Sequence, residues 1–115
     1  MISVRIDRDD ENRIKSFICE GHAGYKMQTE QFDLVCASVS AIIYTALGYM
    51  EEYYKFNDFE EKNGFIKWQR PDVSGIETGV LVNISTATDA MAVGLKQIEM
   101  QYGKYIKVLD GYREV

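Results

Sequence analysis

One segment of this 115-residue chain constrains its fold more than any other. No charged residue occurs from Leu34 to Met50, although 27% of all residues are charged. The segment is shorter than the roughly 20 apolar residues that span a bilayer, so we interpret it as a buried helix of a soluble protein. Asp33 lies directly before it and is predicted to be the helix N-cap. The glutamates at 51 and 52 oppose the negative end of the helix dipole, which predicts a helix end near Met50.

Strand patterns lie on both sides of this helix. Residues 1–7 alternate apolar and polar side chains, and residues 13–20 are predicted to return as the second strand of a hairpin. A loop is expected at 21–31. Residues 53–59 and 65–70 are predicted to form a second hairpin, because an Asn-Gly turn signal separates them.

The segment after Ile76 has two interpretations. Its first residues, GVLVNIS, have the composition of a strand. A helix from near Ile76 to Tyr102 explains more, since apolar positions recur every three or four residues throughout that span. Gly103 is then the expected C-cap, and Tyr105 to Leu109 a last strand. The resulting order is ββαββαβ, which predicts a single α+β domain over residues 1–115, with a sheet packed against two main helices.

Composition limits the function. The net charge of −5 argues against a general nucleic-acid binder, which needs basic patches, and favours basic partners. The N-terminal sequence carries no signal-peptide pattern, so we expect a cytoplasmic protein with no membrane segment. The two cysteines could pair, but a reducing compartment favours thiols, and we expect Cys19 to face inward from its strand.

Cys36 and His22 are the candidate catalytic residues. If Asp33 caps the helix, Cys36 lies in the first turn, where the positive end of the dipole favours a thiolate. The alternative is a small buried hydrophobic residue. His22 is the only histidine in the chain and lies between Gly21 and Ala23, so it is either a reachable general base or an ordinary loop histidine.

Supporting groups are also suggested by the sequence. The backbone N–H of Cys36 and the hydroxyl of Ser38 are candidate oxyanion donors. A metal site is disfavoured because the chain lacks CxxC and HxxxH pairs, and no phosphate-binding loop motif is present, so no cofactor is expected.

The motifs resemble a known family. EGHAGY after an N-terminal hairpin, DLVCASVSAI opening a buried helix, and VGLKQIEMQYGKYIKV near the end are together similar to the bacterial ribosomal-processing cysteine protease (Prp) family. The resemblance implies that His22 is the general base, that Cys36 is the nucleophile and that Asp33 matches the acidic residue ahead of it. It also implies an α+β homodimer that removes the N-terminal extension of large-subunit ribosomal protein L twenty-seven.

Two functions therefore follow from the sequence. The first is a cysteine endopeptidase acting on a ribosomal protein precursor, in which Asp33 either orients His22 or only caps the helix. The second is a non-catalytic ribosome-assembly module whose loop binds a partner. The nearest structural criterion between them is whether Cys36 and His22 can approach one another.

Overall fold

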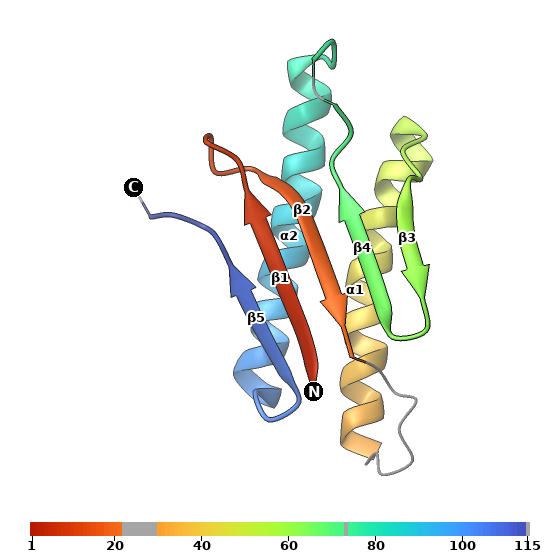
Figure 1. Ribbon diagram of the computed structural model, residues 1–115, viewed down its shortest axis with the longest axis vertical. Coiled ribbons are helices and arrows are strands. Elements are labelled where there is room, and N and C mark those ends of the chain that lie inside the picture. The colour runs from red at the N-terminus through yellow and green to blue at the C-terminus, as the bar shows by residue number, and fades with distance from the viewer. Residues whose placement is uncertain (22–29, 73, 115) are drawn as a thin grey trace.

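The computed structural model describes residues 1–21, 30–72 and 74–114. Five strands form one mixed sheet in the order β3-β4-β2-β1-β5 (Figure 1). β1 and β5 run parallel, and the other neighbouring pairs are antiparallel. The strands are β1 (Ile2–Arg8), β2 (Ile14–Glu20), β3 (Phe59–Lys62), β4 (Phe65–Gln69) and β5 (Ile106–Asp110).

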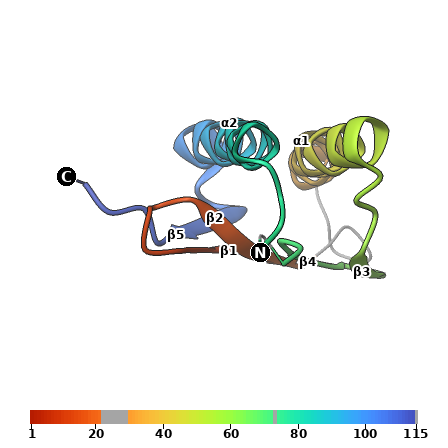
Figure 2. The same ribbon diagram turned by 90° about the horizontal axis from the view of Figure 1, so that it is seen from above.

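Two long helices, α1 (Glu30–Tyr54) and α2 (Thr78–Tyr102), cover the same face of the sheet. Figure 2 shows them side by side above it, with α2 over the β1–β5 side and α1 over the β3–β4 side. The predicted α+β class and the order ββαββαβ are confirmed.

The core lies between the sheet and the helices. In β1, Ile2, Val4 and Ile6 are at most 2% exposed, whereas Ser3 and Arg5 point to the open face. This alternation is the one that the sequence predicts for a half-buried strand. Each helix contributes one apolar stripe to the same cluster, made of Val35, Val39, Ile43, Ala46, Leu47 and Met50 from α1 and Ile84, Met91, Ala92 and Leu95 from α2.

The ends of α1 differ from the prediction. The helix begins at Glu30, so Asp33 is its fourth residue and the predicted N-cap at Asp33 is wrong. It also continues four residues past Met50, because Tyr54 and Phe56 pack against the core and outweigh the unfavourable glutamates near the C-terminal end. Lys55, with φ of 61°, follows the last turn.

The strand predicted at 53–59 is consequently wrong for most of its length. Its first two residues belong to α1, and β3 begins only at Phe59. The hairpin prediction itself is confirmed, since Lys62 pairs with Phe65 across a turn made of Asn63 and Gly64. Gly64 has a φ of 75°, a conformation that glycine adopts without strain.

The ambiguous segment is a helix, as the longer periodicity predicts. α2 starts two residues after Ile76, and Ile84 and Leu95 are fully buried on its inner face. Thr88 is buried among them because its hydroxyl donates a hydrogen bond to the Ile84 carbonyl at 2.9 Å. Gly103 is the C-cap, although its φ of −57° is right-handed.

Candidate active site around Cys36

Cys36 lies six residues after Glu30, in the second turn of α1, and its side chain is half-buried. Only the first four N–H groups of a helix lack a partner within the helix. The prediction that the backbone N–H of Cys36 serves as an oxyanion donor is therefore wrong, and the helix dipole acts on the thiol from a greater distance than expected. The sequence missed this because an N-cap at Asp33 places the helix start at Leu34, four residues after Glu30.

Ser38 does not face the same way as Cys36. Residues two apart on a helix lie on different faces, and the Ser38 hydroxyl donates to the Leu34 carbonyl at 2.8 Å. Because that bond uses its only proton, the hydroxyl is not free to donate to an oxyanion in this conformation. Ser40, one turn beyond Cys36, shares the face of the thiol instead.

A cavity of about 520 Å³ opens beside Cys36. Its walls come from the start of α1, the ends of β1 and β2, and the β3–β4 hairpin. The lining combines apolar side chains with polar groups: Ile2, Cys19, Gly21, Cys36, Ala37, Val39, Ser40, Ile43, Tyr44, Lys62, Asn63, Gly64, Phe65 and Ile66. A concave site in which polar groups converge among apolar side chains is the usual form of a binding site.

Sequence reasoning did not identify the hairpin residues of this lining. Lys62 and Asn63 are distant in sequence from Cys36, and only the pairing of β4 with β2 brings their turn to the cavity. The Tyr44 hydroxyl donates to the Glu61 carboxylate, which ties α1 to β3 at the cavity wall. The four-residue spacing of Cys36, Ser40 and Tyr44 was the one sequence pattern that could have placed these side chains on a common helix face.

His22 and the side chain of Asp33 lie outside the part of the chain that the structure describes. Their predicted roles stay predictions. The structure does describe Gly21, which directly precedes His22 and lines the cavity. Its N–H donates to the Gly64 carbonyl at 3.0 Å, and its φ is 96°. The backbone therefore leaves β2 toward His22 from the wall of the cavity that holds Cys36.

Gly21 is also sterically required. A Cβ atom at this position would lie 2.3 Å from the carbonyl oxygen of Met1, far inside contact distance. The end of β2 thus passes against the start of β1 at a point where only glycine fits. This close approach fixes where the segment carrying His22 begins.

Cys19 lies beneath the cavity on the central strand β2. It is 7% exposed, as predicted, and burial raises the pKa of its thiol to about 12, with a further contribution from the charge of Cys36. At neutral pH the Cys19 thiol is therefore protonated and a poor nucleophile. Both cysteines are thiols in the structure, as expected.

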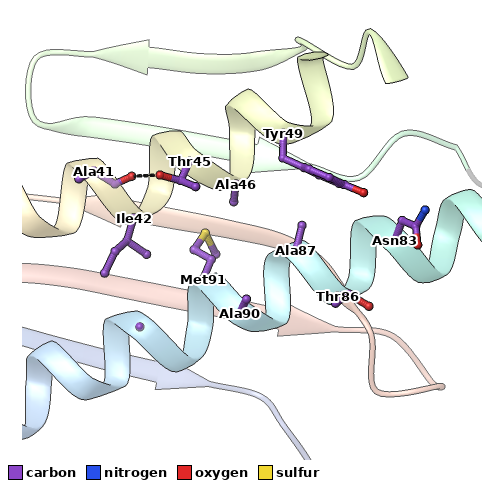
Figure 3. A pocket seen from close by; sticks show the side chains of 11 residues that line it. Ala41, Ile42, Thr45, Ala46, Tyr49, Asn83, Thr86, Ala87, Ala90 and Met91 are labelled. Atoms are coloured by element: carbon purple, nitrogen blue, oxygen red, sulfur yellow. Dashed lines mark hydrogen bonds between the residues drawn. The ribbon is translucent and has the colours of Figure 1, made fainter. Parts of the chain in front are cut away.

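A second cavity, of about 540 Å³, lies between α1 and α2 (Figure 3). Small side chains such as Ala41, Ala87 and Ala90 line it, and the hydrogen bond from Thr45 to the Ala41 carbonyl runs along its α1 wall. No candidate catalytic residue among the described residues contributes to it, so Cys36 marks the other cavity as the candidate active site.

Comparison with known proteins identifies the family. A family profile described as cysteine protease Prp matches residues 1–107. The ribosomal processing cysteine protease Prp of Bacillus subtilis (strain 168) is 27% identical over 111 residues, which covers 94% of this chain and 96% of the relative.

Solved structures share the fold. The ribosomal processing protease Prp from S. aureus in complex with a substrate peptide superposes with a TM-score of 0.80 at 22% identity, covering 96% of this chain and 99% of that one. A Streptococcus mutans protein gives a TM-score of 0.76 at 20% identity, covering 96% of this chain and 93% of that one. With the profile match over nearly all of its length and a thiol in the wall of a cavity, the chain belongs to the cysteine protease Prp family.

Proposed function

We propose that this protein is a cysteine endopeptidase in which Cys36 is the nucleophile and His22 the general base. The observation that carries the proposal is the position of Cys36, half-buried in the wall of a cavity of about 520 Å³. The exit of β2 at Gly21, on the wall of the same cavity, supports a nearby imidazole. Asp33 remains the candidate for orienting His22.

The chemistry follows from this arrangement. The Cys36 sulfur attacks the scissile carbonyl carbon while His22 holds the thiol proton, and His22 then gives that proton to the leaving amine. Water, activated by His22, hydrolyses the thioester and regenerates the thiol. The apolar floor formed by Val39, Ile43 and Ile66 suits a large apolar side chain of the substrate next to the cleaved bond.

We propose a ribosomal protein precursor as the substrate, and specifically the N-terminal extension of large-subunit ribosomal protein L twenty-seven. The family membership supports a ribosomal substrate, because the Bacillus subtilis relative is a ribosomal processing protease. The net charge of −5 also favours association with a basic protein.

The resemblance further implies a homodimer in the cytoplasm, and we include both in the proposal. The exposed apolar side chains of the two helices support a protein partner, and they include Leu34, Val82, Val93 and Met100. Light scattering on the purified protein gives the molar mass directly. A mass of one chain at micromolar concentration would contradict the dimer.

Incubation with the full-length precursor tests the proposed activity. We expect the intact protein to shorten the precursor to one product mass, and Cys36→Ala to give no product while keeping its circular dichroism spectrum. Cys19→Ala is the matched control, since it removes the other thiol and should retain cleavage. If the wild-type protein binds the precursor and leaves its mass unchanged, the non-catalytic assembly module is the better description.

A further inference from the structure

The cavity beside Cys36 contains a second thiol that the proposed cleavage does not use. Cys19 projects into it from β2, and Cys36 lines it from α1. Cys19 pairs with Val4 on one side and Ile66 on the other, so it lies on the inner face of the sheet, beneath the start of α1. Cys19 and Cys36 therefore line one cavity from two layers of the fold, the sheet and the helix layer.

The two thiols differ in exposure. Cys36 is half-buried and open to the cavity, whereas only 7% of Cys19 is exposed. Burial raises the pKa of Cys19 to about 12, so this thiol stays protonated and reacts slowly with oxidants from solution. An oxidant small enough to enter the cavity therefore meets Cys36 first.

We propose that Cys19 and Cys36 form an oxidation site, in which a hydroperoxide oxidises Cys36 and Cys19 then resolves the product as an intramolecular disulfide. This proposal rests on the proposed function in one respect, since it takes Cys36 to be the reactive thiol. It adds a role for Cys19 that cleavage does not require.

The reaction balances in two steps. The Cys36 thiolate attacks one oxygen of hydrogen peroxide, the O–O bond breaks, and the sulfur becomes a sulfenic acid while hydroxide leaves. The Cys19 sulfur then attacks the Cys36 sulfur, the S–O bond breaks, and the hydroxyl leaves as water with the proton of Cys19. Two thiols and one peroxide thus give one disulfide and two waters.

The low exposure of Cys19 suits this role. Cys19 is mostly protonated at neutral pH, but a thiol with a high pKa is a stronger nucleophile once it is deprotonated, and its attack on Cys36 is intramolecular because both residues line one cavity. The disulfide protects Cys36 from the irreversible sulfinic acid and closes the cavity to substrate until a low-molecular-weight thiol reduces it. The protease is then reversibly silenced under oxidation.

Intact-mass analysis of the full chain tests the proposal. The protein is treated with an excess of hydrogen peroxide, because a sulfinic acid consumes two peroxides for each thiol, and it is then quenched with catalase and measured with and without dithiothreitol. We expect the wild-type protein to lose about 2 Da, for the two hydrogens released, and to regain them on reduction. Cys19→Ala should instead gain about 32 Da, for the sulfinic acid, without recovery in dithiothreitol. Cys19→Val is the second variant in case alanine leaves a cavity that destabilises the fold.

The outcomes are distinct from those that test the protease. The mass measurement needs no substrate. If the wild-type protein cleaves the precursor but gains about 32 Da under peroxide, without forming the disulfide, the oxidation site is overturned and the protease is not. The same conclusion follows if Cys19→Ala recovers fully in dithiothreitol. A wild-type protein that forms the disulfide and cleaves nothing contradicts the proposed activity and leaves the oxidation site in place.

Discussion

Replacement of Gly21 by alanine tests how the fold positions the segment that carries His22. Gly21 has a φ of 96°, and its Cβ would lie 2.3 Å from the Met1 carbonyl oxygen. Gly75 is the matched control. Its φ of 89° is nearly the same, but a Cβ there would meet nothing within 4 Å. Comparison of the two alanine variants therefore separates the cost of the backbone conformation from the cost of the contact.

The expected magnitudes follow from these contacts. A side chain in the left-handed region costs about 1–2 kcal/mol, which both variants share. In Gly21→Ala the end of β2 must also move away from Met1, which weakens the 3.0 Å hydrogen bond from the Gly21 N–H to the Gly64 carbonyl. Such a bond contributes about 1 kcal/mol, so we expect a loss of about 2–3 kcal/mol for Gly21→Ala and about 1–2 kcal/mol for Gly75→Ala.

Urea unfolding followed by circular dichroism measures both free energies, and cleavage of the ribosomal precursor measures the effect on the site. Because His22 follows Gly21 directly, we expect kcat/KM of Gly21→Ala to fall by at least about tenfold under conditions where the variant is folded. Gly75→Ala should cleave at the wild-type rate. Equal losses of stability and equal activities in the two variants would refute the role assigned to the contact with Met1.

Four further outcomes are expected. Iodoacetamide should label Cys36 at a lower pH than Cys19, whose pKa is raised to about 12 by burial, and equal labelling of both thiols at every pH would contradict this. Since the unfolded thiol ionises near 9 and the folded Cys19 near 12, the stability contributed by its burial is complete below pH 9 and is lost as the pH rises toward 12. The difference in free energy of unfolding between wild type and Cys19→Ala should therefore stay constant below pH 9 and change only in that window. Arg8→Met should lower the free energy of unfolding in urea by about 3 kcal/mol, because Arg8 is bonded to Asp110 at 2.8 Å and both side chains are buried. A loss below about 1 kcal/mol would show that Lys96 alone satisfies the Asp110 carboxylate. Gly48→Ala should raise the free energy of unfolding by up to about 1 kcal/mol, since Gly48 lies inside α1 with open space around it, and a destabilised variant would show that this face packs against something.

The ion-pair cluster at Arg8 also predicts behaviour in acid. Burial alone would raise the pKa of Asp110, but hydrogen bonds from Arg8 and Lys96 hold it below its ordinary value of 3.8. The stability from this pair is therefore present above that value and is lost as the pH falls through the lowered pKa. These residues join β1, β5 and α2, so acid should loosen that side of the sheet first.

The sequence by itself determined the elements with strong periodicity. Alternation in residues 1–7 predicted β1 and its buried face, because each strand position has one of two orientations. The steps of three and four residues after Ile76 predicted α2, since no strand explains a stripe that persists to Tyr102. The Asn-Gly pair predicted the turn at Asn63 and Gly64, because these two residue types favour the backbone conformation of a two-residue hairpin turn.

The site was predicted by its residue types and not by its geometry. The motif around Cys36 made it the candidate nucleophile, and that role stays a prediction, but the predicted cap at Asp33 placed Cys36 in the wrong turn of the helix. A residue with a high N-cap preference can also lie inside a helix when tertiary packing favours a longer helix. Local sequence does not predict tertiary packing. The same effect carried α1 beyond Met50 to Tyr54.

Only the tertiary structure decided what surrounds Cys36. The hairpin turn at Asn63, the thiol of Cys19 and the backbone of Gly21 reach one cavity from segments that are far apart in the chain. Their meeting depends on the strand order β3-β4-β2-β1-β5, which non-local pairing establishes and local propensity does not. The requirement for glycine at 21 has the same origin. The atom that excludes a side chain there belongs to Met1, which is 20 residues away in sequence and lies beside Gly21 because β1 pairs with β2.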